Sequence, residues 1–168
     1  MILSHPPSVD VYTLPMAEHP LDEYLIRVVF YEPRNFSRDD FKQFMFDQSQ
    51  PFPDMLRLLA GLKARHALKV AVVSNEAREL TAHRIAKFGL DTFVDFFIVS
   101  SYVHFRKPDP DIFRLAIDVA QVPVSQVVYL EDRPMFVEVA QTLGLRGIRH
   151  ENYETTKAAF AALGLSLD

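Results

Sequence analysis

Three short polar segments carry the side chains in this sequence that could perform chemistry. Ser74-Asn75 and Glu131-Asp132 each follow a short apolar run, and Lys107 lies within the segment Arg-Lys-Pro-Asp-Pro. A hydroxyl, an amide and the N–H groups of a helix N-terminus can hold phosphate oxygens, and a lysine supplies a compact positive charge. Two adjacent carboxylates offer the hard oxygen ligands that suit magnesium. Together the three segments predict a site for metal-assisted phosphoryl chemistry.

Each segment also has a purely structural interpretation. Ser74 or Asn75 could cap the helix that follows its strand, and Asp132 could cap the next predicted helix. The sequence around Lys107 could be a surface turn leading into a helix, since proline and acidic residues favour a helix N-terminus. The carboxylates of Glu131 and Asp132 are hardest to explain in this way, because they repel each other and a cation would relieve the repulsion.

The elements that position these segments alternate between strand and helix. Short β-branched runs, typical of parallel strands covered on both faces, alternate with segments of helical period. Strands are predicted at 68–73, 93–99, 127–130 and 147–149, and helices at 76–88, 111–120, 134–143 and 153–163. Four such alternations predict an α/β fold with a mainly parallel sheet. Because ligands of open α/β sheets bind at the carboxyl ends of the strands, the three polar segments should meet there.

The N-terminal third has a different pattern. The first 20 residues contain four prolines and no helical period, which indicates an extended segment. The next 30 residues are helical in pattern, and their second helix carries an apolar face of Phe41, Phe44 and Met45. The chain therefore divides into a proline-rich lead (1–20), a helical piece (21–50) and an α/β domain (51–168).

Composition excludes several classes of protein. The chain has 168 residues, enough for one domain, and its net charge of −4 argues against nucleic acid or an anionic membrane as a partner. It contains no cysteine, which excludes disulfides, thiolate metal sites and cysteine catalysis. No apolar run approaches the roughly 18 residues of a membrane span, and the N-terminus lacks the pattern of a secretory signal. We therefore expect a cytoplasmic protein.

The ordered set of polar segments resembles the second, third and fourth motifs of the haloacid dehalogenase (HAD) superfamily. The matching sequences are Val-Val-Ser-Asn ending at Asn75, Arg-Lys-Pro-Asp-Pro around Lys107 and Leu-Glu-Asp-Arg-Pro around Glu131. The resemblance covers about residues 20–165 and is closest to the phosphatase-like subgroup with a helical cap. It implies a HAD-like Rossmannoid fold, with helices on both faces of a mainly parallel sheet and a partial cap formed by residues 21–50.

The resemblance also implies a function. Related proteins of this subgroup are magnesium-dependent phosphohydrolases that act on small phosphorylated metabolites through an aspartyl phosphate. By this resemblance Ser74, together with Asn75, would bind phosphate, and Lys107 would stabilise both the phosphate and the nucleophile. Asp132 would bind magnesium with the assistance of Glu131. A haloacid-type hydrolase of carbon–halogen bonds is an alternative within the superfamily.

The first motif of the family is not found in this sequence. It has the pattern Asp-x-Asp-x-Thr/Val after the central strand, and its first aspartate is the nucleophile. The only candidate is Asp10, but Tyr12 stands where the second acid belongs and Thr13 arrives one residue early. We therefore expect Asp10 not to be the nucleophile, and the chain to start after the first strand and its motif. The 168-residue chain should then be inactive and should bind magnesium weakly.

The missing motif has a structural consequence. By resemblance the sheet order is 5-4-1-2-3, so the loss of strand 1 opens the middle of the sheet and leaves backbone groups unpaired. The two bordering strands could pair directly, residues 8–14 could fill the position, or another chain could supply a strand. Exchange of the lead before Leu21 predicts a homodimer. A non-catalytic phosphate-binding or regulatory protein is the functional alternative to a hydrolase.

Overall fold

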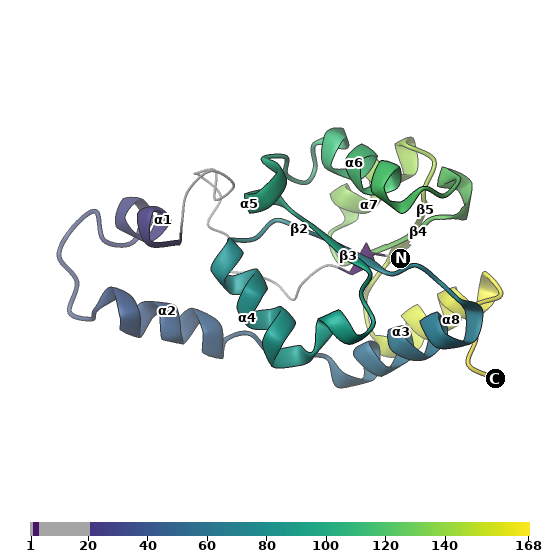
Figure 1. Ribbon diagram of the computed structural model, residues 1–168, viewed down its shortest axis with the longest axis horizontal. Helices are drawn as coiled ribbons and strands as arrows, with labels where there is room; N and C mark the ends of the chain where they lie inside the picture. The colour runs from purple at the N-terminus through teal and green to yellow at the C-terminus, as the bar shows by residue number, and fades with distance from the viewer. Residues whose placement is uncertain (1, 4–20) are drawn as a thin grey trace.

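A five-stranded parallel sheet forms the centre of the protein in the computed structural model, which describes residues 2–3 and 21–168. The strands are β1 (Ile2–Leu3), β2 (Ala71–Ser74), β3 (Phe96–Val99), β4 (Val128–Glu131) and β5 (Arg146–Arg149). Their spatial order is β3-β2-β1-β4-β5, which is the order expected from the resemblance. The α/β fold and its parallel sheet are therefore confirmed (Figure 1).

The central position of the sheet is filled, and the expectation of a missing strand is corrected. Ile2 pairs with Ala71 of β2 and with Tyr129 of β4, and Leu3 pairs with Val72. None of the three alternatives considered for this position named residues 2–3, because a two-residue strand has no periodicity to detect. Residues 8–14 and the remainder of the proline-rich lead lie outside the described residues.

The strand before Ser74 begins later than its apolar run suggests. β2 starts at Ala71, whereas the run begins at Leu68. Asp95 explains the difference, because its side chain accepts a hydrogen bond from the N–H of Val70 at 2.7 Å and its own N–H donates to the Val70 carbonyl at 2.8 Å. The backbone of Val70 is therefore engaged by a loop before the ladder between β2 and β3 begins.

Helices cover both faces of the sheet, as Figure 1 shows. One face carries α3 (Pro53–His66), α4 (Arg78–Phe88) and α8 (Tyr153–Ala162), and the other carries α6 (Pro110–Ala120) and α7 (Pro134–Thr142). Each layer buries its own apolar cluster against the strands, centred on Leu59 and Phe160 on the first face and on Phe113 and Tyr129 on the second. This two-sided burial explains the continuous apolar character of β2 and β4.

Two helices lie beyond the carboxyl end of β2. They are α1 (Leu21–Val28) and α2 (Arg38–Asp47). The side chains of Leu21, Tyr24 and Leu25 form a small apolar cluster with Ala77, which immediately precedes α4. Helix α2 begins at a capping box between Ser37 and its third helical residue, and none of its residues is fully buried.

The remaining described elements are short. A helix of four residues, α5 (Ser100–Val103), follows β3, and two 3-10 turns, η1 (Leu90–Thr92) and η2 (Val124–Gln126), precede β3 and β4. The sequence pattern did not predict these three elements, because a single turn is shorter than one helical repeat of apolar residues. Across the described ranges, none of the helices combines the length and the apolar character needed to cross a membrane.

Candidate functional site

The polar segments meet at the carboxyl edge of the sheet. Ser74 is the last residue of β2 and Glu131 is the last residue of β4, and both side chains are buried. Because β1 lies between β2 and β4, these two strand ends flank the end of the central strand on either side. Parallel strands bring their carboxyl ends to one edge, which is where α/β sheets bind ligands.

A reciprocal pair of hydrogen bonds joins the first polar segment to the second. The side-chain amide of Asn75 donates to the carbonyl of Lys107, and the N–H of Lys107 donates to Oδ1 of Asn75, each at 2.7 Å. Both hydrogen-bonding groups of the amide are therefore used to hold the backbone of Lys107. Asn75 is accordingly a positioning residue for the lysine segment, in addition to the phosphate contact that the sequence predicts.

Lys107 forms a buried ion pair with Glu131. Its Nζ lies 2.7 Å from Oε2 of Glu131, and the two side chains are only 4% and 1% exposed. Burial lowers the pKa of Lys107, and the negative charge of Glu131 offsets part of that effect. The pair fixes a positive group at the carboxyl edge, next to the segment that follows β4. This geometry brings together two of the residues that the sequence predicted for the site.

Glu131 is held by further donors besides Lys107. The hydroxyl of Tyr129 donates to Oε2 at 2.7 Å, and the N–H groups of Asp132 and Arg133 donate to Oε1 at 3.1 and 3.2 Å. Burial and the adjacent carboxylate raise the pKa of Tyr129, so its phenol stays protonated and can donate. Both oxygens of Glu131 are thus engaged within the protein.

Tyr129 was not identified from the sequence. Its side chain is fully buried and packs edge-on against Phe113, with ring centroids 5.2 Å apart. The period of two along a strand places residues 129 and 131 on the same face, which is the signal that could have identified it. Phe136 also borders the site, because its ring centroid lies 5.1 Å from Nζ of Lys107.

The two carboxylates that the sequence predicts as magnesium ligands, Asp132 and Glu131, differ in their surroundings. Residue 132 is partly buried and directly follows the strand end, whereas Glu131 is turned toward four donors of the protein. Among residues 2–3 and 21–168, no group of three or more acidic, histidine or cysteine side chains gathers to enclose a metal ion. One carboxylate, supplemented by water and a bound phosphate, matches the sparse protein ligation that magnesium accepts.

A second buried network supports the loop after Ser74. Glu76 is 4% exposed, forms an ion pair with Arg84 and accepts a hydrogen bond from Thr81 at 3.0 Å, while its N–H donates to Ser100 at 3.1 Å. Nε of Arg84 also donates to the hydroxyl of Ser49 at 3.1 Å, in the connection between α2 and α3. The sequence analysis missed this network, because its members are separated along the chain and belong to no shared motif.

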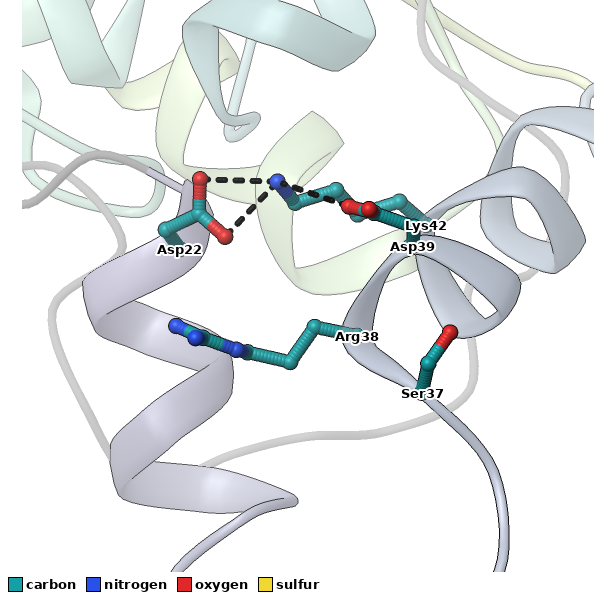
Figure 2. A pocket seen from close by; sticks show the side chains of 5 residues that line it. All are labelled: Asp22, Ser37, Arg38, Asp39 and Lys42. Carbon is teal, nitrogen blue, oxygen red and sulfur yellow. Dashed lines mark hydrogen bonds and ion pairs between the residues drawn. The ribbon is translucent and has the colours of Figure 1, made fainter.

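A surface hollow of about 390 Å³ lies elsewhere, between α1 and α2. Figure 2 shows its lining, in which Nζ of Lys42 reaches both carboxylate oxygens of Asp22 and also faces Asp39. Ser37 and Arg38 complete the wall. None of the predicted site residues lines this hollow, so it is separate from the carboxyl edge. Asp10, the remaining sequence candidate, lies outside the described residues.

Comparison with protein families gives a match over most of the chain. A family model for haloacid dehalogenase-like hydrolases matches residues 16–144. The phosphorylated carbohydrates phosphatase of Thermotoga maritima is 26% identical over 96 residues, which are 57% of this chain and 44% of that protein. The chain thus spans less than half the length of this curated relative.

Solved structures share the fold. A HAD-like family hydrolase from Porphyromonas gingivalis superposes with a TM-score of 0.71 at 20% identity, covering 89% of this chain and 76% of that one. A HAD family enzyme from Bacteroides thetaiotaomicron, in complex with magnesium and inorganic phosphate, gives a TM-score of 0.68 at 16% identity, covering 82% and 72%. At these identities the likeness concerns the fold alone.

Proposed function

Because the chain belongs to the haloacid dehalogenase-like hydrolase family, we propose that its carboxyl edge is a magnesium-dependent site for small phosphorylated metabolites. In this proposal Ser74 and Asn75 contact the phosphate, Lys107 neutralises its charge, and Asp132 holds the metal. The family reaction is phosphoester hydrolysis through an aspartyl phosphate. We further propose that the 168-residue chain does not itself complete that reaction.

The observation that carries the proposal is the buried pair of Lys107 and Glu131 at the carboxyl edge. Burying two charges is expensive, and a structural pair is often no more stabilising than apolar side chains of similar size. A fixed cation beside two strand ends is instead what stabilisation of a transferring phosphoryl group requires. The two hydrogen bonds between the Asn75 side chain and the backbone of Lys107 support the same interpretation, because they fix the position of the lysine relative to Ser74.

Magnesium is assigned to Asp132 in this proposal. Bound there, it would polarise a phosphoryl oxygen and reduce the negative charge on the phosphate. Glu131 would act indirectly, since its oxygens already accept hydrogen bonds from Lys107 and Tyr129 and from two backbone N–H groups. The complex of the Bacteroides thetaiotaomicron enzyme with magnesium and phosphate supports this choice of cation.

The proposed lack of turnover follows from the sequence after the central strand. In this fold the nucleophilic aspartate is expected directly after β1, which here ends at Leu3. The next four residues are Ser-His-Pro-Pro, and the first carboxylate after them is that of Asp10. The sequence therefore has no aspartate at the expected position to attack the phosphate and form an aspartyl phosphate.

Two alternatives have different support. A non-catalytic phosphate-binding or regulatory protein is favoured by the same absence of an aspartate after β1, since the predicted phosphate ligands are present without it. A hydrolase of carbon–halogen bonds would also need that aspartate as its nucleophile, so the residue after β1 disfavours both hydrolytic reactions equally. The similarity to a phosphatase favours phosphate over halide as the recognised group.

Two measurements test the proposal. With magnesium, the purified chain should hydrolyse p-nitrophenyl phosphate no faster than its Lys107→Ala variant, whereas turnover abolished by Asp10→Asn would make Asp10 the nucleophile. Inorganic phosphate should bind to the chain in titration calorimetry, and Ser74→Ala should weaken binding about tenfold, equivalent to one charged hydrogen bond. Circular dichroism shows whether each variant is folded. Equal phosphate affinity of wild type and Ser74→Ala would contradict the assigned phosphate site.

A further inference from the structure

A buried pair of charges, Glu76 and Arg84, lies next to the predicted phosphate-binding segment Ser74-Asn75. The two side chains form an ion pair in which Glu76 is buried and Arg84 is only 15% exposed. Burial lowers the pKa of Arg84, and the charge and hydrogen bond of Glu76 offset part of that effect. Apolar side chains of similar volume are often at least as stabilising as such a pair. A role in positioning therefore explains the pair better than stability does.

Glu76 holds the backbone that follows the segment Ser74-Asn75. Its N–H donates at 3.1 Å to the hydroxyl of Ser100, the first residue of α5, and its carboxylate accepts a hydrogen bond from Thr81 of α4 at 3.0 Å. All three side chains are buried. Because Glu76 directly follows Asn75, these contacts limit where the phosphate-binding segment can lie.

Arg84 also reaches the connection between α2 and α3. Its Nε donates to the hydroxyl of Ser49 at 3.1 Å, and Ser49 is 1% exposed. Nζ of Lys87 lies 3.5 Å from the carbonyl oxygen of Ser49, and the ring of His83 stacks on that of Phe46 with centroids 4.6 Å apart. One side of α4 thus holds both the end of α2 and the connection, which passes α4 on its way to α3 (Figure 1).

We propose that Arg84 is a positioning residue that links the α2–α3 connection to the phosphate-binding segment through Glu76. The contacts run from Ser49 to Arg84 and from Arg84 to Glu76, and they end at the backbone beside Asn75. Hydrogen bonds weaken steeply with distance and angle, so a small displacement of Ser74 lowers the affinity for phosphate. This inference rests on the proposed function, since it concerns how the same site is held in place.

Titration calorimetry of the 168-residue chain with inorganic phosphate tests the link. Ser49→Ala removes an acceptor of Arg84 and should weaken phosphate binding about fivefold. Glu76→Gln removes the counter-charge and should weaken it at least as much. The combined variant Ser49→Ala/Glu76→Gln should bind phosphate no more weakly than Glu76→Gln alone, because both substitutions interrupt one series of contacts. Circular dichroism shows which variants are folded, and Ser49→Ala, which removes no charge, decides the test if Glu76→Gln does not fold.

Asp95→Asn is the matched control. Asp95 pairs with Lys63 and accepts a hydrogen bond from the N–H of Val70, so it holds the amino end of β2, away from the phosphate-binding segment. This substitution should lower stability while the affinity for phosphate remains that of the wild type. A merely structural role of Ser49 and Glu76 would make their variants behave like this control.

The outcomes separate the link from the proposed function. Phosphate binding by Ser49→Ala that equals binding by the wild type would overturn the link alone, and so would a combined variant in which the two effects on affinity add. An equal loss of affinity in Asp95→Asn would overturn it as well, because affinity would then follow stability. Failure of the wild-type chain to bind inorganic phosphate would overturn the proposed function and the link with it.

Discussion

Nζ of Lys107 and Oε2 of Glu131 lie 2.7 Å apart at the carboxyl edge of the sheet, with both side chains almost completely buried. The same oxygen accepts a hydrogen bond from Tyr129, so the carboxylate joins a lysine from the loop before α6 to a tyrosine within β4. The pair therefore belongs both to the folded core and to the proposed site. Its removal should be visible in stability as well as in ligand binding.

The buried pair predicts a large loss of stability when one partner is removed. Glu131→Gln should lower the free energy of unfolding by about 3 kcal/mol, because it leaves the ammonium of Lys107 buried without a counter-charge. Asp111→Asn is the control, since it breaks the exposed ion pair with Arg114 and should cost less than about 1 kcal/mol. Urea denaturation measures both. Equal, small effects of the two substitutions would show that the buried pair is not required for folding.

Asp95 predicts a dependence of stability on pH. Burial raises the pKa of Asp95, but hydrogen bonds from Lys63 and from the N–H of Val70, with the charges of Lys63 and Lys69, outweigh it and lower the pKa overall. A carboxyl with a lowered folded pKa stabilises the protein above its unfolded pKa, and this contribution disappears as pH falls through the folded value.

Wild type should therefore be more stable than Asp95→Asn at pH 7, and the difference should shrink below about pH 4. Urea denaturation at several pH values between 7 and 3 measures this difference in the free energy of unfolding. Lys63→Met should reduce it, because Nζ of Lys63 lies 2.6 Å from the carboxylate. A difference between wild type and Asp95→Asn that stays constant with pH would contradict the prediction.

Asp132 predicts that magnesium binding depends on phosphate. One protein carboxylate binds a reluctantly dehydrated cation weakly, and a bound phosphate supplies additional oxygens. In titration calorimetry, phosphate should increase magnesium affinity about tenfold, and Asp132→Asn should remove the increase. Glu138→Gln, at an exposed position of α7, is the control and should bind like wild type. Tight magnesium binding without phosphate would be incompatible with this site.

The aromatic face of α2 predicts a homodimer or a larger species. Phe44 is 55% exposed, and its ring adjoins that of Phe41, which in turn stacks on Phe36. Light scattering coupled to size exclusion should show a mass above the 19.3 kDa monomer at micromolar concentration, and Phe44→Ser should shift it toward the monomer. Phe52→Ser is the control, because Phe52 is equally exposed but precedes α3.

A monomer for both the wild type and Phe44→Ser would rule out this face as an interface. The argument for association from an open sheet no longer applies, because β1 fills the centre. The proposed exchange of the lead before Leu21 involves residues outside the described part of the chain. Deleting residues 1–18 also removes β1, so it tests the exchange in a shortened chain that circular dichroism shows to be folded. An exchanged segment would be needed to maintain the larger species, and a folded shortened chain of unchanged mass would contradict the exchange.

Local patterns in the sequence were sufficient for most of the architecture. Apolar runs and helical periods predicted the alternation of strands and helices, and the ends of elements moved by only a few residues in the structure. The placement of Ser74 and Glu131 at strand ends followed from the same patterns, because strand direction in a parallel sheet brings these ends to one edge. These features depend on interactions between residues that are close along the chain.

The tertiary structure decided what depends on distant residues. Ile2–Leu3 is too short to have a pattern and is a strand only because β2 and β4 offer unpaired backbone groups on both sides. Likewise, the adjacent acids Glu131 and Asp132 suggested two metal ligands. In the folded protein the carboxylate of Glu131 accepts hydrogen bonds from Lys107 and Tyr129, and our proposal assigns the metal to Asp132. A one-dimensional pattern carries no information on which distant donor reaches a given carboxylate, whereas burial makes that pairing obligatory.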